Sequence, residues 1–300
     1  AITTLSLYLS ISFVSLGGII SNIFIFALNV KDCRRKRLSS CDILVSSIAF
    51  SNILFQCLAA VFCSSAVLWD DFYTSDGIIS AMTVTCFFLR SFSLWFSALL
   101  CADYCIKIIN NNQAYFLWLK VTLPKNVPWL GCGAAVVSLV TSLTAIFDHS
   151  FSMKKIPAPG NTTMLVYINT KPKCNCFYAI YLLSTSLAFA LCFTSVISIL
   201  VSLYKHVRRM KRSSENNNAH LTAAKTLTAL LLLYIYFFAA VSYLFNISSI
   251  GTNPVFFYCL LMISSFPLLN ALILIMGNPK LRTSLKNLLL TLLWIYWVII

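Results

Sequence analysis

Two long runs of uncharged residues constrain this chain more than any other feature. Residues 177–204 include no charged side chain, and the run that begins at Thr226 meets none before Lys280. A helix of roughly 20 apolar residues crosses the hydrocarbon core of a bilayer, which is about 30 Å thick. Each run is therefore long enough to form at least one membrane-spanning helix.

A short polar connector separates these two runs. It contains a single acidic residue, Glu215, and six Lys and Arg residues, of which Lys225 is the last residue before the second run. The other five are clustered at its start: Lys205, Arg208, Arg209, Lys211 and Arg212. Clustered Lys and Arg beside a span mark the cytoplasmic side of a membrane. The connector is therefore expected to be a cytosolic loop whose basic edge is available to a partner inside the cell.

Composition extends this interpretation to the whole chain. Of the 300 residues, 59% are hydrophobic and 10% are charged, whereas a soluble domain carries about 25% charged residues. Because so few charges cannot coat a water-facing globule, the lipid bilayer is expected to surround most of the surface. The net charge of +14 is concentrated at the ends of apolar runs, which indicates membrane topology rather than nucleic-acid binding.

Seven spans account for the apolar segments. We expect an all-α membrane protein: a single seven-transmembrane helix bundle over residues 1–300, with a short interfacial helix at the C-terminal end. The spans are predicted at about residues 2–30, 42–69, 78–109, 127–147, 177–204, 223–247 and 255–276, with an interfacial tail at 278–300. Turn residues at 248–254 separate the last two spans. In the tail, Lys280, Arg282 and Lys286 are expected to meet lipid headgroups.

The distribution of Lys and Arg orients the bundle. Seventeen of the 22 basic residues fall on the side of the connector and the tail, and four on the opposite side. Cytoplasmic loops carry the excess of positive charge, so we expect an extracellular N-terminus and a cytoplasmic C-terminus at the plasma membrane. The longest outer segment, residues 148–176, contains the N-glycosylation acceptor Asn161-Thr-Thr. A second match at Asn246 lies at the membrane edge, where a chance sequon is favoured.

The twelve Cys residues have no spacing typical of a metal site. Ten lie in or beside predicted spans, where Cys acts as a small hydrophobic residue. Cys174 and Cys176 form a C-x-C without a second ligand pair nearby. The span cores contain no clustered nucleophile and base, so neither a cofactor, a metal nor an enzymatic activity is predicted.

Short motifs along nearly the whole chain are specific in their order and spacing. The end of the fifth span, Ser202-Leu-Tyr-Lys-His206 with Met210, resembles an SLWKHxxxM signature. Residues 219–225 and 230–234 resemble AHxxALKT and FLLLY, and residues 274–282 resemble LILxGNPKLK. Further matches lie at residues 36–44, 92–95, 106–108 and 253–256. Together these motifs resemble those of the bitter taste receptors, the type 2 taste receptor family of G-protein-coupled receptors.

The resemblance implies a receptor for small, bitter or noxious molecules that activates a heterotrimeric G protein. The agonist is expected between the outer halves of spans three, five, six and seven. The implied ligand-binding positions are Cys86, Phe87, Arg90, Ser91, Tyr236, Ala239, Tyr243, Phe256, Leu260 and Ile263. The expected G-protein-facing residues are Tyr104, Lys107, Lys205, His206, Arg208, Arg209, His220, Lys225 and Arg282.

Several positions depart from the family pattern and indicate a divergent member. The family usually has Arg where this chain has Asn52, Trp at Cys86, Asn at Arg90 and His at Ser91. Arg90 is the one charged residue deep inside a predicted span, and a charge at mid-bilayer costs about 2.5–3.5 kcal/mol on insertion scales. We expect Arg90 either to line the pocket as a cationic handle for anionic agonists or to act as an internal strut bonded to neighbouring carbonyls and amides.

Three amide side chains lie in three different predicted spans. Asn22, Asn52 and Asn270 are expected to seek partners across helices. A shared internal polar network is one hypothesis, and independent local hydrogen bonds are the other.

Two other classes of membrane protein compete with this interpretation. A vomeronasal type 1 receptor would share the seven-span architecture, although the first-loop and tail motifs favour taste. A small-solute transporter would usually show an internal repeat or paired broken helices, and the sequence shows neither.

Overall fold

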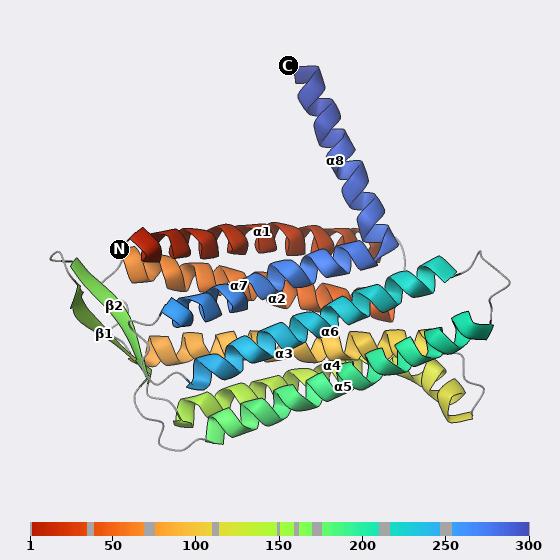
Figure 1. Ribbon diagram of the computed structural model, residues 1–300, viewed down its shortest axis with the longest axis horizontal. Coiled ribbons are helices and arrows are strands. Elements are labelled where there is room, and N and C mark those ends of the chain that lie inside the picture. Colours follow the sequence, from red (N-terminus) through yellow and green to blue (C-terminus); the bar gives the residue numbers. More distant parts are fainter. Residues whose placement is uncertain are drawn as a thin grey trace.

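The computed structural model is a bundle of long helices (Figure 1). It describes residues 2–34, 39–68, 76–109, 114–148, 151–158, 162–169, 176–209, 217–246 and 254–299; in the strands and near several helix ends only the backbone is described. Seven of the described helices are long and apolar enough to cross a membrane. The predicted seven-helix bundle is therefore confirmed.

The helices extend beyond the apolar segments from which they were predicted. They are α1 (Ile2–Cys33), α2 (Ser40–Leu68), α3 (Asp76–Ile108), α4 (Ala114–Asp148), α5 (Cys176–Arg209), α6 (Asn217–Asn246), α7 (Pro254–Gly277) and α8 (Pro279–Ile299). The largest difference is in α4, which begins at Ala114 and continues through Pro124 and Pro128. The predicted start at residue 127 followed the uncharged core, whereas the helix also includes Lys120 and Lys125.

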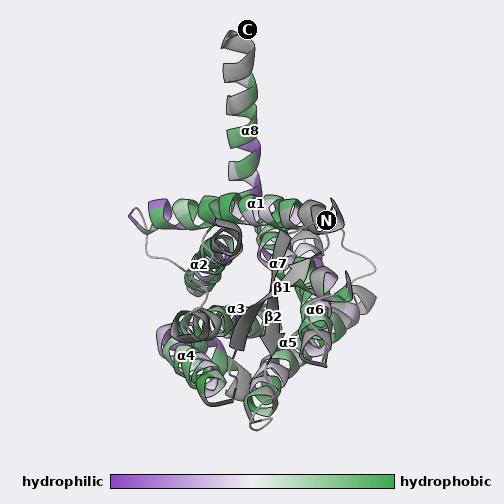
Figure 2. Cartoon of the chain, turned by 90° about the vertical axis from the view of Figure 1, so that its left-hand side faces the viewer, coloured by the Kyte–Doolittle hydropathy of each residue, from purple (hydrophilic) through white to green (hydrophobic). Residues whose placement is uncertain are grey.

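Helix α3 lies at the centre of the bundle. It packs against α2, α4 and α5, while α1 lies against α2 and α7. Helix α6 packs against both α5 and α7, which completes the ring that Figure 2 shows from the end. Residues far apart in the sequence therefore meet around α3, and Leu94, Ala98 and Leu100 of α3 lie in the buried core.

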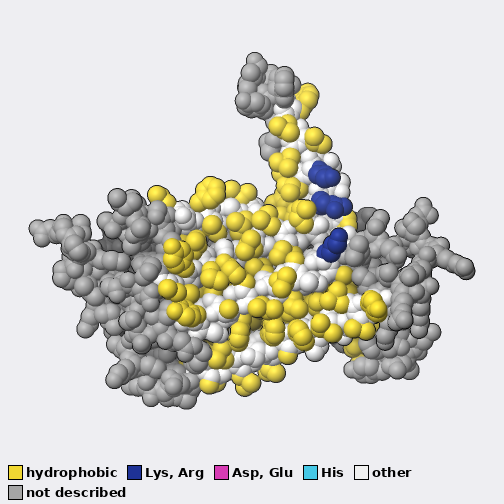
Figure 3. All heavy atoms as spheres, in the orientation of Figure 1, with side chains coloured by type: hydrophobic (Ala, Val, Ile, Leu, Met, Phe, Trp, Pro, Cys, Tyr) yellow, Lys and Arg dark blue, Asp and Glu magenta, His cyan; other side chains and the backbone are white. Residues whose placement is uncertain are grey.

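The outside of the bundle is apolar. On α1, the side chains of Leu9, Phe13, Leu16 and Ile20 are exposed at helical spacing. Hydrophobic side chains cover much of the described surface on the face shown in Figure 3, whereas Lys and Arg gather at the base of α8. This surface suits a protein surrounded by lipid.

A β-hairpin lies at the same end of the bundle as the N-terminus (Figure 1). Strand β1 (Phe151–Ala158) pairs antiparallel with β2 (Thr162–Asn169), in a register that joins Phe151 to Asn169 and Ala158 to Thr162. The sequence analysis expected only helices and left residues 148–176 without an element. The β-branched and aromatic residues of β2, which favour strands, were the overlooked signal. The predicted glycosylation site Asn161 lies outside the described residues.

Helix α8 leaves the bundle at the opposite end and runs across the direction of the other helices (Figure 1). Its start is capped by Asn278, whose side-chain oxygen accepts a hydrogen bond from the backbone N–H of Lys280 at 3.0 Å. Leu289, Leu290, Leu293 and Trp294 are exposed along it. This direction and this apolar surface match the interfacial helix predicted for the tail.

Candidate functional site

The guanidinium of Arg90 is enclosed by three aromatic rings from three other helices. Its central carbon lies 4.5 Å from the ring centroid of Phe55 in α2, 4.6 Å from Phe237 in α6 and 4.3 Å from Phe266 in α7. Cation–π attraction of this kind contributes from about 0.5 to 2 kcal/mol per ring, most where water is excluded. Arg90 is 5% exposed. The prediction that this cation faces the bundle interior is therefore confirmed.

A chain of hydrogen bonds joins α1, α2, α3 and α7 near this cage. The Asn22 amide donates to the carbonyl of Pro267 at 3.2 Å, and the Asn52 amide donates to Asn22 at 3.4 Å. The Ser93 hydroxyl donates to Asn52 at 3.1 Å. Asn270 is buried three residues after Pro267, but its amide has no hydrogen-bond partner among the described residues. The network hypothesis thus holds for two of the three amides.

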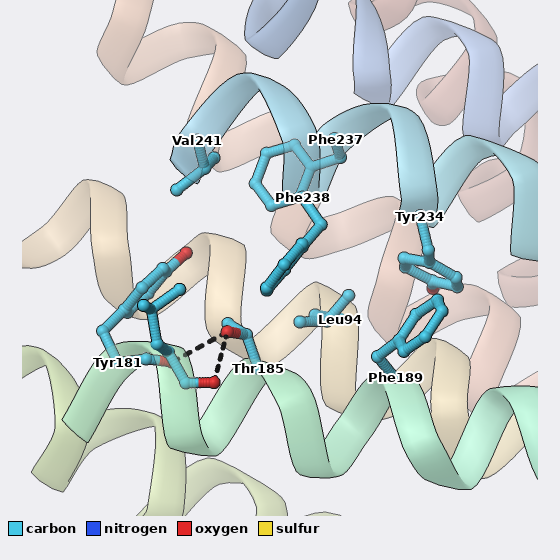
Figure 4. Close-up of a pocket in the computed structure, with 9 residues that line it drawn as sticks. Leu94, Tyr181, Thr185, Phe189, Tyr234, Phe237, Phe238 and Val241 are labelled. Atoms are coloured by element: carbon cyan, nitrogen blue, oxygen red, sulfur yellow. Dashed lines mark hydrogen bonds between the residues drawn. The ribbon is translucent and has the colours of Figure 1, made fainter. Parts of the chain in front are cut away.

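A narrow cleft opens between α3, α5 and α6 (Figure 4). It is lined by Leu94, Tyr181, Leu182, Thr185, Phe189, Tyr234, Phe237, Phe238 and Val241. The Thr185 hydroxyl donates to the backbone carbonyls of Tyr181 and Leu182 at 2.8 and 3.1 Å. Its hydrogen is therefore already used within α5 and is not available to a ligand. The cleft is therefore suited to an apolar or aromatic group.

Phe237 connects the cleft to the cage. Its ring lines the cleft, lies over the Arg90 guanidinium and sits 4.9 Å from the Phe266 ring between centroids. A molecule that displaces this ring must disturb packing between α3, α6 and α7. The cleft and the buried Arg90 guanidinium therefore share one contacting side chain, that of Phe237.

The predicted ligand-binding residues of α3 lie beside the cleft, although they do not line it. The Phe87 ring packs edge-on against Phe177 and Tyr181 of α5, with centroids 5.0 and 5.2 Å apart. Cys86 is half-buried and Ser91 is buried. The structure therefore brings this part of the predicted set to the contact between α3 and α5.

The predicted residues of α6 and α7 are more dispersed. Tyr236 lies within hydrogen-bond distance, 3.3 Å, of Ser265 in α7, and Leu260 and Ile263 are half-buried. Ala239 and Tyr243 are exposed on the same helical stripe as Leu232 and Ile235, so they face away from the core. The side chain of Phe256 lies outside the described part of the chain.

The sequence analysis missed the α5 wall of the cleft. Tyr181, Thr185 and Phe189 line the cleft and recur every four residues, a spacing that places them on one face of α5 together with Phe177. This stripe, in which three of the four residues are aromatic, was the available signal. It was overlooked because the run 177–204 is uncharged on every side, and without a charged face the sequence does not show which face is turned inward.

A buried carboxylate organises the other end of α3. Asp103 accepts hydrogen bonds from the Ser40 hydroxyl at 3.0 and 3.1 Å and pairs with Lys107 at 2.6 Å. Lys107 also donates to Ser40 at 2.7 Å. Tyr104, the next residue, accepts a hydrogen bond from the Cys41 thiol at 3.2 Å. The start of α2 and the end of α3 are therefore clamped together.

A second ionic cluster holds the base of α8. Lys280 pairs with Asp32 of α1 at 2.6 Å and with Asp42 of α2 at 3.5 Å, and donates to Asn29 at 3.2 Å. Partial burial acts to lower the pKa of Lys280, but Asp32 and Asp42 outweigh it and raise the pKa above its ordinary value. Lys280 is therefore a charged tether between α8, α1 and α2.

The other predicted G-protein-facing residues lie at this same end. Lys225 and Arg282 are exposed. The side chains of Lys205, His206, Arg208, Arg209 and His220 lie outside the described part of the chain. Among the described residues, no group of three or more His, Cys, Asp or Glu side chains could hold a metal ion.

Comparison with known proteins agrees with the resemblance drawn from the motifs. The family model described as Taste receptor protein (TAS2R) matches residues 2–293. Taste receptor type 2 member 2 of Homo sapiens is 29% identical over 281 residues, which cover 91% of each chain. Taste receptor type 2 member 7 of Macaca mulatta is 29% identical, covering 95% of this chain and 92% of the relative. Taste receptor type 2 member 40 of Gallus gallus is 27% identical, covering 92% of each.

Proposed function

This chain belongs to the type 2 taste receptor family, and we propose that its agonist is a small bitter or noxious molecule. Family and architecture together make it a G-protein-coupled receptor, a multi-pass protein of the plasma membrane. The proposed agonist site lies between the outer halves of α3, α5, α6 and α7. Agonist binding favours an arrangement that opens the cytoplasmic side to a heterotrimeric G protein.

The observation that carries this mechanism is the position of Phe237. A ligand shifts a conformational equilibrium only through a difference in its affinity for the two arrangements. The Phe237 ring contributes to the cleft and to the Arg90 cage. The affinity of a ligand in the cleft therefore depends on how α6 packs against α3 and α7. Movement of α6 is therefore the step that agonist binding biases.

The proposed orientation places the hairpin and the N-terminus outside the cell. The base of α8, the Asp103 clamp and the basic connector then lie in the cytosol, as the excess of Lys and Arg on that side requires. The proposed contacts for the G protein are Tyr104, Lys107, Lys205, His206, Arg208, Arg209, His220, Lys225 and Arg282. Asp103 and Lys280 hold together the surface that presents them.

Ligand-dependent nucleotide exchange tests this function directly. Membranes containing the full chain and a purified heterotrimeric G protein are screened with a panel of bitter compounds. A receptor accelerates exchange at defined agonist concentrations. A small-solute transporter, the alternative from another class, instead moves a compound across the membrane and leaves exchange unchanged.

A matched pair of variants on α5 locates the site. Thr185→Trp fills the cleft, whereas Leu187→Trp adds the same ring at a position that is 55% exposed on the outside of the bundle. We expect Thr185→Trp to weaken agonist potency at least tenfold, or about 1.4 kcal/mol, and Leu187→Trp to leave it unchanged. Equal potencies for the two variants, both present at the cell surface, would place the agonist elsewhere.

A further inference from the structure

Arg90 is a buried cation whose hydrogen-bond donors are unmet. A guanidinium carries five N–H donors in one plane. None of its three nitrogens has a hydrogen-bond partner among the residues that the structure describes. The rings of Phe55, Phe237 and Phe266 attract the positive charge through their faces, but a ring face is a poor substitute for an oxygen or halide acceptor in the guanidinium plane.

The described acidic side chains do not neutralise this charge. Asp103 pairs with Lys107, while Asp32 and Asp42 pair with Lys280. All three lie near the end of the bundle that carries α8. An ionised side chain in a dry interior requires a nearby opposite charge or a full set of hydrogen bonds, since removing it from water is costly.

Other hydrogen-bond donors close to the cage in sequence are also buried and unpartnered within the described chain. They are the hydroxyl of Ser91, the amide of Gln56 and the amide of Asn270. Ser91 follows Arg90, Gln56 follows Phe55, and Asn270 lies one turn after Phe266. Each can donate a hydrogen bond, so the helices that form the cage carry further unmet donors among their described residues.

We propose that Arg90 binds a small monovalent inorganic anion, chloride under cellular conditions. One negative charge balances the positive charge of Arg90, and a charge-assisted hydrogen bond is about twice as strong as a neutral one. The ion must be small because the guanidinium is enclosed by three rings. A weakly hydrated ion loses less on leaving water, and planar nitrate also matches the guanidinium as a bidentate acceptor.

This anion site is distinct from the agonist cleft. The Phe237 ring contributes to both, so an agonist in the cleft reaches Arg90 only after that ring moves. The carboxylate of an acidic agonist has the same chemistry as the inorganic ion. Measurements made without agonist therefore separate the two sources.

Anion-dependent thermal stability of the full chain, purified in detergent without agonist, provides the test. The unfolding temperature is measured in sodium chloride, sodium nitrate and sodium gluconate at equal ionic strength, because gluconate is too large for the cage. We expect chloride and nitrate to raise the unfolding temperature over gluconate by about 2 to 4 °C, with a saturable concentration dependence. Equal temperatures in all three salts, or an effect that rises linearly without saturation, overturn the proposal.

Two variants assign the effect to its residue. Arg90→Gln removes the charge and should abolish the difference between chloride and gluconate, whereas Lys286→Gln removes an exposed charge on α8 and should retain it. Chloride dependence that persists in Arg90→Gln would also overturn the proposal. If Arg90→Gln fails to fold, the saturable titration of the parent protein still decides the matter. Acceptors supplied by the protein itself, such as the Asn270 side-chain oxygen, would give no dependence on the anion.

Discussion

The contact of Asp103 with Lys107 and Ser40 at the end of α3 shows how the burial of one charged group determines the response to mutation. The Asp103 side chain is 1% exposed, whereas that of its partner Lys107 is 38% exposed. Removing one member of the pair therefore has a different consequence from removing the other. A carboxylate left behind remains buried, but an ammonium left behind reaches water.

We expect Lys107→Met to destabilise the protein more than Asp103→Asn. Leaving a buried charged acceptor short of a partner costs about 1–3 kcal/mol or more. After Lys107→Met, the Asp103 carboxylate keeps only Ser40 of the partners found in the described part of the chain. Asp103→Asn removes the charge and retains an acceptor for Ser40. Thermal unfolding in detergent compares the two variants and the double variant, which should recover part of the loss. Equal losses for the two single variants would contradict this account of the clamp.

At the scale of an element, close approach fixes the contact between α6 and α7. A Cβ atom added at Gly277 would lie 2.3 Å from Thr226 Cγ2 and 2.8 Å from Thr226 Cβ. The Cβ belongs to the stiff part of a β-branched residue, so it cannot turn aside as the end of a long side chain could. The last turn of α7 therefore depends on glycine.

We expect Gly277→Ala to lower stability by about 1–3 kcal/mol, the usual cost of overpacking. Gly133→Ala on α4 is the matched control, because its added Cβ has no atom within 4 Å among the described residues beyond its chain neighbours and the adjacent backbone of α4. That variant should be neutral, or more stable by up to about 1 kcal/mol through helix propensity. Thermal unfolding of both variants provides the measurement, and a Gly277→Ala protein as stable as Gly133→Ala would refute the predicted clash.

The tether of α8 has a defined pH dependence. Because the Lys280 pKa is raised in the folded protein, its contribution is fully present below its ordinary pKa of 10.5 and is lost only as pH rises through the higher folded value. We expect the distance between spin labels on α8 and α1 to stay constant from about pH 7 to 10, whereas Lys280→Met should broaden it throughout. Lys286→Met, on the same helix, is the control. A tether that loosens between about pH 7 and 9 would show that another group holds α8.

At the scale of the whole molecule, the charge pattern was sufficient to predict the helices. The uncharged runs predicted the seven spans, and the basic residues after Gly277 predicted the interfacial helix. These features depend on local composition, because the bilayer requires an apolar segment of about 20 residues for every span. The hairpin was missed because β-propensity depends strongly on context and gives a weak signal in a segment between two membrane spans.

The candidate site was less predictable because it depends on contacts between distant segments. Arg90 was expected to face the interior, but its enclosure by Phe55, Phe237 and Phe266 requires the positions of three other helices. The α5 wall of the cleft was missed for a related reason. Periodicity shows which residues share a face, and only tertiary packing shows which face is turned inward.

The basic connector between α5 and α6 should be required for signalling. Neutralising Lys205, Arg208, Arg209 and Lys211 removes the positive charge proposed to meet the G protein, so agonist-stimulated exchange should fall while agonist binding is retained. Lys154 and Lys155, in β1 at the opposite end, provide a control of the same charge type. Intact coupling in a connector variant that reaches the cell surface would rule out this role.

Glycosylation at Asn161 tests the orientation of the entire bundle. Asn161 lies between β1 and β2 in the sequence, and the hairpin shares its end of the bundle with the N-terminus. Oligosaccharide is added only to acceptors that enter the secretory lumen, which becomes the outside of the cell. Asn161→Gln should therefore increase gel mobility as much as enzymatic deglycosylation of the parent protein does. Asn246→Gln, at the last residue of α6, should leave mobility unchanged because that acceptor lies at the membrane edge. If enzymatic deglycosylation leaves the gel mobility of the parent protein unchanged, the proposed orientation is wrong or the chain resides in another compartment.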